Sequence, residues 1–387
     1  MAEIFNNYFP ESGLSHSLAL TESEFDKHPK SNLINEIVDD QDQEFSFSFQ
    51  PVTAKYVWDL LSHPNGSKAT GIDGIPPRLL KASAPALATP LSRLRNYCLE
   101  QSCWISKWKS SNSSPVFKKG CEATKVNYRP ISILPCVSKI FEQIMYEQLY
   151  NYFVSRRLLS DSLSGFLKGH SCCMALLKIT EGWREALGER KTVSAVSIDL
   201  SKAFDSICHC LLIRKLAAYG LLDHSIQLIC SYLINHKQRV KIENAYSNWR
   251  VVQCGVLQGS LLGPLLFNIY INDITYVTKN MELRLYADDT TGYAASNSPA
   301  TLEFYINSDL VRLSQWLEDS YLTINTTKTQ AMIVGKSNYN YELFLKSNNI
   351  LTIDELKLLG VTIDNKFTFS SHIKLVLQIF FLQSVQK

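Results

Sequence analysis

The sequence lacks three features that would each point to a particular class of protein. It has ten cysteines but no C-x-x-C pair, the spacing in which zinc sites commonly take their thiolate ligands. Its most apolar run near the end, residues 375–382, is too short to cross a membrane and is interrupted by Gln378. Its first residues, MAEIFNNYFPESG, lack the apolar core of a secretory signal. We therefore expect an intracellular protein, nuclear or cytoplasmic, without a membrane segment.

Net charge is also nearly absent. Lysine and arginine number 39 and aspartate and glutamate 36, which gives a formal net charge of +3. This balance neither requires nor excludes a nucleic-acid partner, because a local basic groove can exist within a balanced total. The chain does have an apolar fraction of 45%, which is typical of a globular protein with a sizeable core.

The pattern of residues changes along the chain. Residues 1–50 are polar and acidic without sustained periodicity, which predicts a linker or weakly ordered lead-in. Helical patterns follow, including a helix over residues 139–153 that Ser138 can cap. Strands and helices then mix, with a short strand near 358–363. We predict an α+β fold class.

Two strand patterns bring aspartates to strand ends. TVSAVSID reads as a buried strand that ends at Asp199, and ELRLYADDTTGYAA reads as a hairpin with Asp288 and Asp289 at its turn. Adjacent carboxylates repel each other unless a cation neutralises them, and Mg²⁺ prefers such oxygen ligands. If the strand pairs beside the hairpin, Asp199 and Asp288 can share two metals roughly 3.5–4 Å apart. That arrangement suits in-line nucleotidyl transfer.

A plainer interpretation competes with this one. An Asp-Asp pair is usually a solvated turn, and an aspartate at a strand end is usually a capping residue. Cys208 and Cys210 flank His209 as half of a possible metal site, although free buried cysteines are commoner. The conjunction of IDLSKAFD, QGSLLGP and YADD, in this order, favours catalysis over solvated turns.

The chain resembles the reverse transcriptases of non-LTR (LINE-type) retrotransposons. SIDLSKAFDS is similar to the family's first palm motif, GVLQGSLLGPLLFNIYIND to the second and LYADDTTGY to the third. LTINTTKTQAMIVG resembles the fourth and ELKLLGVTID the fifth. TGIDGIPPRLL, NYRPISILPCVSKIFEQIM and GFLKGHSCCMALLKITEGW resemble its finger-side blocks. The match covers roughly residues 50–370, and the combination is far more specific than any single motif.

The resemblance implies a right-hand polymerase with helical and stranded fingers, an antiparallel-sheet palm and a truncated thumb. It assigns residues 51–190 to the fingers side, 191–364 to the palm with a fingers insertion at about 207–250, and 365–387 to the start of the thumb. It implies transfer of dNTPs to the 3′-hydroxyl of a DNA primer on an RNA template. Two Mg²⁺ ions, or Mn²⁺ in their place, would serve this reaction.

Residue by residue, the resemblance places Asp199, Asp288 and Asp289 as the catalytic and metal-binding acids. The backbone carbonyl of Leu200 would be a further metal ligand. Substrate-binding roles fall on six other positions: Lys118, Arg129, Phe204, Gln258, Gly259 and Lys328.

These six positions have different implied roles. Arg129 would grip the triphosphate because its planar fork binds phosphate oxygens bidentately, with Lys118 or its neighbour as partner. The Phe204 ring would lie under the incoming sugar and clash with a 2′-hydroxyl. Gln258 and Gly259 would contact the template and the nascent pair, and Lys328 would act as a general acid toward pyrophosphate. The plainer alternatives are a core aromatic for Phe204, a turn for Gly259 and exposed charges for the lysines.

The chain departs from the family pattern at several places. Leu257 stands where proline commonly precedes the Gln-Gly pair, and Leu167 stands where a basic residue is frequent. LVLQIFFLQSVQK does not continue the thumb pattern, and the chain is too short to include the endonuclease or RNase H of longer elements. An inactive relic that retains only nucleic-acid binding is therefore an alternative. A metal-dependent phosphatase or nuclease is a third, but it leaves the Gln-Gly loop unexplained. The sequence does not specify the oligomeric state.

Overall fold

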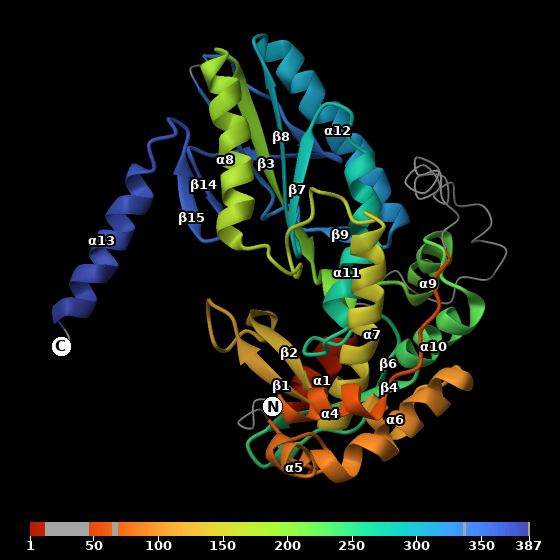
Figure 1. Ribbon diagram of the computed structural model, residues 1–387. Coiled ribbons are helices and arrows are strands. Elements are labelled where there is room, and N and C mark those ends of the chain that lie inside the picture. The colour runs from red at the N-terminus through yellow and green to blue at the C-terminus, as the bar shows by residue number, and fades with distance from the viewer. Residues whose placement is uncertain (12–45, 64–68, 336–337, 386–387) are drawn as a thin grey trace. The chain divides into compact units, whose positions relative to one another are not determined.

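The computed structural model describes four stretches of the chain: residues 1–11, 46–63, 69–335 and 338–385 (Figure 1). They form two compact units, and the chain passes between the units three times. Unit 1 comprises Met1–Leu159 and Lys202–Ile271, and unit 2 comprises Ser160–Ser201 and Asn272–Lys387. Residues 160–190, which we expected in a fingers-side region, thus pack within unit 2.

Unit 1 is mainly helical. Its α-helices are α1 (Ala2–Glu11), α4 (Ala54–Ser62), α5 (Pro77–Ala82), α6 (Ala84–Glu100), α7 (Cys136–Ser155), α9 (His209–Ala218), α10 (Asp223–Leu233) and α11 (Gly263–Ile271). Its strands are β1 (Ser110–Phe117), β2 (Tyr128–Ile133), β4 (His236–Ile242), β5 (Ala245–Tyr246) and β6 (Arg250–Val252). Short 3-10 helices complete it: η1 (Ser106–Lys109), η2 (Lys125–Asn127) and η3 (Ala203–Asp205).

The sheet of unit 1 has the order β2-β1-β4-β5, with β6 paired to β4. Strand β1 is antiparallel to β2 and parallel to β4. Helix α1 lies against β4, where buried Phe5 and Phe9 pack with Val240. The first part of the expected lead-in is therefore the helix Ala2–Glu11, because Ala2, Phe5 and Phe9 form one apolar face. The rest of that lead-in up to residue 45 lies outside the described residues.

Helix α7 begins earlier than the sequence predicted. We expected Ser138 to cap a helix over residues 139–153, whereas α7 begins at Cys136 with Pro135 as its extended N-cap. Ser138 is buried inside the first turn. The fixed φ of proline suits the position before a helix, and the helix starts there without a side-chain cap.

Unit 2 is built on a sheet. Its strands are β3 (Thr192–Ser201), β7 (Glu282–Tyr286), β8 (Asp289–Ser296), β9 (Thr323–Ile324), β10 (Gln330–Val334), β11 (Phe344–Leu345), β12 (Asn348–Asn349), β13 (Leu351–Thr352), β14 (Glu355–Leu358) and β15 (Val361–Asp364). Its helices are α8 (Cys172–Gly188), η4 (Asn272–Tyr276), α12 (Pro299–Asp319) and α13 (Ser370–Val385).

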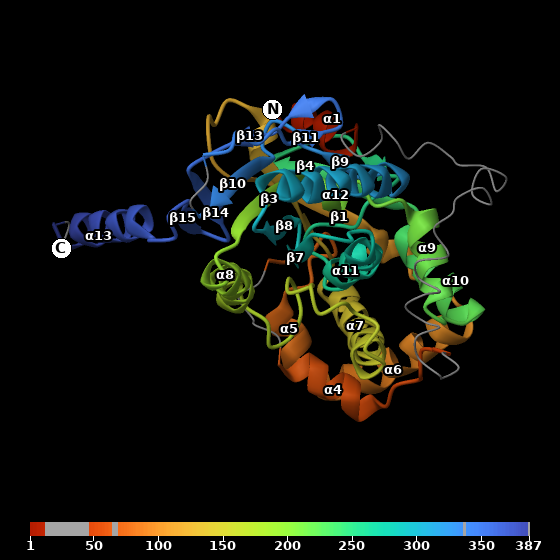
Figure 2. The ribbon, with the colours of Figure 1, turned by 90° about the horizontal axis from the view of Figure 1, so that it is seen from above.

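The main sheet of unit 2 has the order β13-β10-β3-β8-β7, with β9 also paired to β3. Its central pairs, β10–β3, β3–β8 and β7–β8, are antiparallel. Helices α8 and α12 lie on opposite faces of β3 and β8 (Figures 1 and 2). On the α8 face, Trp183 and Ile179 pack against Val193, Ala195 and Tyr293. Apolar burial on both faces fixes the register of β3, because a slip of one residue would reverse every side chain.

The predicted hairpin is confirmed by β7–β8, and the predicted buried strand by β3. The fold as a whole combines helices with several sheets. The strand expected near residues 358–363 is confirmed from Val361 onward, in β15, but it is not one continuous strand. The chain turns at Leu359 and Gly360, both at positive φ, and forms the β14–β15 hairpin. Among the described residues, no helix has the length and apolar character needed to cross a membrane.

Candidate active site

Asp199 and Asp289 lie opposite each other on adjacent strands of unit 2. They are register partners in the antiparallel pair β3–β8. Directly opposite residues of such a pair project to the same face, with Cβ atoms about 4.5–5.5 Å apart. Alternation along β3 puts Asp199 on the face of Val193 and Ala195, beyond the apolar cluster. The fold therefore brings together two aspartates that are ninety residues apart in the chain.

Asp288 occupies the hairpin turn next to this pair. Tyr286 pairs with Asp289, which leaves Ala287 and Asp288 as a two-residue loop. Ala287 has φ 57°, a left-handed conformation at the position where such turns favour glycine. Asp288 is half-buried and Asp289 is exposed. The tight turn thus holds two consecutive carboxylates at the end of the hairpin, at a cost in backbone strain.

Lys328 is brought close to one of these acids, Asp199. Its Nζ lies 3.6 Å from Oδ2 of Asp199, and the Asp199 side chain is 35% exposed. The carbonyl of Asp199 accepts a hydrogen bond of 2.8 Å from the backbone N–H of Asn325, just after β9. An exposed ion pair of this length adds little stability. The ion pair matters for its location, because it puts a positively charged group beside the Asp199 carboxylate.

The oxygen ligands that these acids offer are of the type that a divalent metal ion binds. Carboxylate oxygens on Asp199, Asp288 and Asp289 are the hard ligands that Mg²⁺ prefers. The Lys328 ammonium lies beside the Asp199 carboxylate. In the part of the chain that the structure describes, however, no three His, Cys, Asp or Glu side chains converge as a ready metal-binding group. The donor set fits the metal, and its three members are not drawn together around one point.

Gly165 supports the hairpin turn from its outer side. Ser164 N–H donates to the Leu285 carbonyl at 2.8 Å, and Leu285 N–H donates to Ser162 at 2.9 Å. A Cβ on Gly165 would lie 2.1 Å from the backbone nitrogen of Ala287. Only glycine allows this approach. The backbone of this segment therefore packs directly against the turn that carries the two acids.

In unit 1, Arg129 lies on the exposed β1–β2 ribbon. Its register partner is Val116, and the ladder continues beyond the strand because Lys118 N–H donates to the Asn127 carbonyl at 2.8 Å. Both Arg129 and Lys118 are exposed. Val116 and Lys118 project to the same face by alternation, and cross-strand partners share a face. The register therefore puts Lys118, rather than Lys119, on the face of Arg129.

Gln258 and Gly259 are bound to the neighbouring strand β2. Ser132 N–H donates to the Gln258 carbonyl at 2.7 Å. Gly259 has φ 113°, and a Cβ there would lie 2.6 Å from the Ser132 carbonyl oxygen. The residue therefore needs glycine for both conformation and space. The close backbone approach at Gly259 is made within unit 1, to strand β2.

The ring of Phe204 is fixed by another aromatic ring. It stacks on Phe267 of α11 with the centroids 4.4 Å apart and an interplanar angle of 23°. The Phe204 carbonyl accepts a 2.8 Å hydrogen bond from Val256 N–H, which ties η3 to the loop before Gln258. Phe204 is half-buried, so one part of the ring is packed and the other is accessible.

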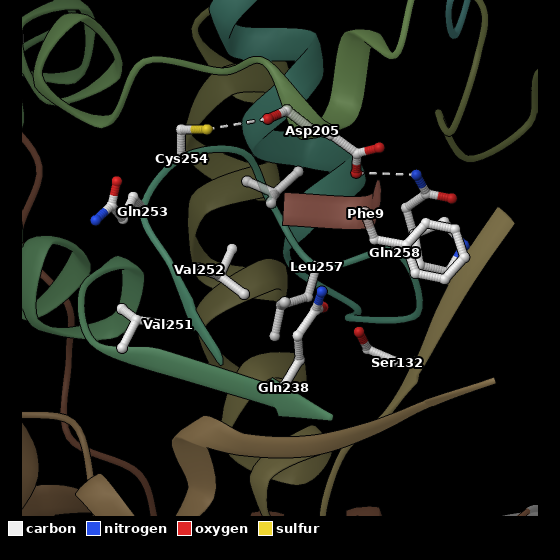
Figure 3. Close-up of a pocket in the computed structure, with 12 residues that line it drawn as sticks. Phe9, Ser132, Asp205, Gln238, Val251, Val252, Gln253, Cys254, Leu257 and Gln258 are labelled. Atoms are coloured by element: carbon white, nitrogen blue, oxygen red, sulfur yellow. Dashed lines mark hydrogen bonds between the residues drawn. The ribbon is translucent and has the colours of Figure 1, made fainter. Parts of the chain in front are cut away.

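Asp205 and Gln258 border a small cavity of unit 1, drawn in Figure 3 with its lining residues. Gln258 Nε2 donates to Asp205 Oδ1 at 3.0 Å. Burial raises the pKa of Asp205 to about 6, against the lowering effects of this hydrogen bond and of the Lys202 charge. Helix α1 contributes Phe9 to the lining, and the Lys202 ammonium lies 3.6 Å from the ring centroid of Tyr8.

A buried carboxylate anchors the start of α11. Oε2 of Glu142, on α7, accepts a hydrogen bond of 2.6 Å from Leu261 N–H. Burial raises the pKa of Glu142 to about 7, although the N–H groups of Leu261 and Leu262 and the charge of Lys139 lower it. The carboxylate thereby satisfies donors at a helix start, where anions are favoured. It also fixes the loop that follows Gln258 and Gly259.

The raised pKa of Glu142 predicts a pH-dependent stability. Its pKa is about 7 in the folded chain against an ordinary value of 4.5, so its ionisation opposes folding as the pH rises between these values. Glu142→Gln should remove that slope, on the order of 3 kcal/mol in the free energy of unfolding. Urea unfolding at pH 5 and pH 8 measures it. The exposed-site control Glu100→Gln should keep the wild-type slope, and an unchanged slope in Glu142→Gln would refute the assignment.

Within the described stretches of the chain, the cysteine-histidine cluster is not part of a group of three metal-ligating side chains. Cys208 is buried, Cys210 is exposed, and all ten cysteines are free. His209 Nε2 lies 2.7 Å from the Gly255 carbonyl, so one ring nitrogen has a backbone partner. Free cysteines were the plainer interpretation of this segment, and both Cys208 and Cys210 are free.

The structure also identifies supporting residues that the sequence alone did not single out: Glu142, Gly165 and Asp205. Gly165 and Glu142 lie inside blocks that resemble the family's finger-side motifs, and Asp205 directly follows Phe204. Their contacts join residues 53 to 122 positions apart. Motif spacing gives the position of such residues, but only the fold shows what they touch.

The sequence is similar to those of known proteins. The family described as reverse transcriptase (RNA-dependent DNA polymerase) matches residues 116–363, more than half of the chain. The probable RNA-directed DNA polymerase from transposon BS of Drosophila melanogaster is 28% identical over 86% of this chain. The RNA-directed DNA polymerase from mobile element jockey, also of Drosophila melanogaster, is 27% identical over 87%. The chain spans 38% of the length of each of these two relatives.

The family match includes the strand and hairpin that carry the aspartates, together with the ribbon of Arg129 and the Gln258 loop. The relatives named above are transposon or mobile-element polymerases. The similarity to these relatives supports a place among the LINE-type members, and the family match shows that the chain belongs to the reverse transcriptase family.

Proposed function

We propose that this chain is an RNA-directed DNA polymerase that adds dNTPs to the 3′-hydroxyl of a DNA primer on an RNA template. The observation that carries the proposal is the β3–β8 register, which sets Asp199 opposite Asp289 with Asp288 in the adjoining turn. Membership of the reverse transcriptase family supplies the reaction class. A two-metal centre is the form of catalysis that such acids suit.

The acids of unit 2 would hold the metal ions. Asp199, Asp288 and Asp289, with the backbone carbonyl of Leu200, are the proposed ligands for two Mg²⁺ ions, or for Mn²⁺. When bound, the metal supplies neutralisation of the phosphate charge and of the carboxylates. The chain's own part is to keep the three carboxylates on one rigid sheet end. The Lys328 ammonium, 3.6 Å from Asp199, is the proposed proton donor to pyrophosphate.

Basic residues of unit 1 would bind the triphosphate. Arg129 is the proposed bidentate phosphate ligand because its fork matches two phosphate oxygens. Lys118 is the proposed partner, since the register of the β1–β2 ribbon puts it on the same face. Gln258 and Gly259, held by Ser132, are the proposed contacts to the template and the nascent pair.

The right-hand architecture is assigned on the same basis. The sheet of unit 2 is the proposed palm, because it carries the acids. The ribbon and helices of unit 1 are the proposed fingers, and the return of residues 202–271 to unit 1 supports an insertion of finger structure between palm motifs. Helix α13 is the proposed beginning of a thumb.

Phe204→Ala should relax the selection of deoxynucleotides over ribonucleotides. The ring is fixed by stacking on Phe267, so it cannot move aside for a 2′-hydroxyl without losing that contact. We expect the ratio of kcat/KM for dTTP over UTP to fall at least about 10-fold. Single-nucleotide incorporation measures both values. Phe304→Ala, at an exposed ring on α12, is the matched control, and an unchanged ratio in Phe204→Ala would exclude the sugar contact.

The proposed function is tested by copying a defined RNA. The 387-residue chain is incubated with a mixed-sequence RNA template, an annealed DNA primer, four dNTPs and Mg²⁺. A DNA product complementary to the template is expected, and none without template. Failure to extend would favour a relic that only binds nucleic acid. Release of nucleotides from DNA in the absence of dNTPs would favour a metal-dependent nuclease instead.

A further inference from the structure

The hydrogen bond between Asp205 and Gln258 joins two segments that are 53 residues apart. Gln258 Nε2 lies 3.0 Å from Asp205 Oδ1. Figure 3 shows the amide nitrogen directed at the carboxylate, with the amide oxygen on the other side of the group. Neither role proposed for Gln258 so far explains why a carboxylate should lie beside it.

The backbones on both sides of this bond are tied together. Val256 N–H donates to the Phe204 carbonyl and Gly255 N–H to the Ile207 carbonyl, each at 2.8 Å. The thiol of Cys254 donates to the carbonyl of Asp205 at 3.3 Å. These contacts fix the distance between the two segments. The side-chain bond is therefore built into a rigid frame and is more than a chance surface contact.

The chemistry of the pair determines the orientation of the amide. An ionised carboxylate only accepts hydrogen bonds, so the glutamine must turn its NH₂ group toward it. The amide oxygen then faces away from Asp205 as a hydrogen-bond acceptor. A neutral acid can donate as well as accept, and it would allow the amide to turn over. The charge on Asp205 thus selects which polar group Gln258 presents.

We propose that Asp205 is a positioning residue that orients the Gln258 amide so that its oxygen faces the incoming nucleotide. The proposal rests on the proposed polymerase function for the identity of the ligand. The hydrogen bond and the frame around it stand independently of that function. The acceptor oxygen would favour a nucleotide that presents a hydroxyl or N–H donor at this point.

The surroundings of Asp205 support a change of charge in an accessible pH range. Its pKa is raised to about 6 by burial, while Gln258 and Lys202 lower it. Tyr8 of α1 and Cys254 are the other titratable groups that face it. Burial raises the pKa of Tyr8, and the Asp205 charge raises it further. Asp205 is then ionised at neutral pH and protonated below about pH 6. The orientation of Gln258 should follow this titration.

The first test detects the hydrogen bond between Asp205 and Gln258 directly and does not depend on polymerase activity. The full chain is labelled with ¹⁵N in its glutamine side chains, and the Gln258 amide signal is assigned by its loss in Gln258→Ala. We expect the signal to shift with a midpoint near pH 6, to lose that shift in Asp205→Asn and to keep it in the exposed-site control Asp223→Asn. A signal that does not titrate, or that titrates equally in Asp205→Asn, would overturn the proposal.

The second test separates positioning from a general structural role. In single-nucleotide extension, Asp205→Asn should raise the KM for dNTP about 10-fold with kcat nearly unchanged, and Asp205→Glu should recover part of the loss. The double variant with Gln258→Ala should be no worse than Gln258→Ala alone. Additive losses would contradict positioning through Gln258. If the wild-type chain does not extend the primer, the proposed function is wrong, and so is the nucleotide as ligand. The amide titration would still show whether Asp205 orients the Gln258 amide.

Discussion

Replacing Asp199 with asparagine is expected to abolish primer extension while the chain stays folded. Asparagine has the size of aspartate, and the side chain is 35% exposed, so the β3–β8 register should persist. What is lost is one of two opposed negative charges. If these charges hold the metal, kcat should fall at least about 10³-fold, equivalent to roughly 4 kcal/mol of transition-state stabilisation. Extension rates at saturating dNTP measure the change.

The control for this variant is the same substitution elsewhere in unit 2. Asp161 is exposed, and Asp161→Asn should extend primers at the wild-type rate. Thermal unfolding should be similar in both variants, because the ion pair of Asp199 with Lys328 is exposed and adds little stability. Extension by Asp199→Asn within a few-fold of wild type would mean that Asp199 is a strand residue without a catalytic role.

The second large effect is expected from a methyl group. Gly165→Ala would put a Cβ 2.1 Å from the Ala287 nitrogen and 2.9 Å from its Cα, and both atoms are backbone. No side chain can move to relieve the clash, so the turn carrying Asp288 and Asp289 must shift. Because a displacement of about 1 Å can cost about 100-fold in rate, we expect at least that loss in kcat.

Gly188 offers a matched comparison for this prediction. It ends α8 in the same unit, and a Cβ there would meet no atom within 4 Å. Gly188→Ala should therefore keep full activity. Circular dichroism would show whether Gly165→Ala retains the fold, and a folded variant with wild-type activity would show that the turn does not need this support.

The local parts of the site followed directly from the sequence. Alternating residues predicted the β7–β8 hairpin and the strand before Asp199, because pairing across a two-residue turn is set by neighbours in the chain. The pairing of β3 with β8 is long-range, and the sequence supported it only conditionally. The register that sets Asp199 opposite Asp289 comes from apolar packing on both faces of the sheet.

Other elements were beyond the sequence patterns. The apolar face of α1 consists of only three residues, and the polar residues around them in the sequence obscure the helical periodicity. The β14–β15 turn uses Leu359 at positive φ, a conformation that leucine rarely adopts and that no pattern would suggest. The partners of Asp205 and Glu142 lie 53 and 119 residues away. Such contacts depend on the packing of whole segments, which periodicity does not describe.

The acids of β3 and the β7–β8 turn are proposed to catalyse template-directed DNA synthesis. Incorporation of dTTP on poly(rA)/oligo(dT) with Mg²⁺, by the wild-type chain and by Asp288→Ala in parallel, tests this directly. The wild-type chain should extend the primer and lose this activity on chelation of the metal, and the variant should not extend it. Absence of extension by wild type, or equal extension by Asp288→Ala, would contradict this proposal.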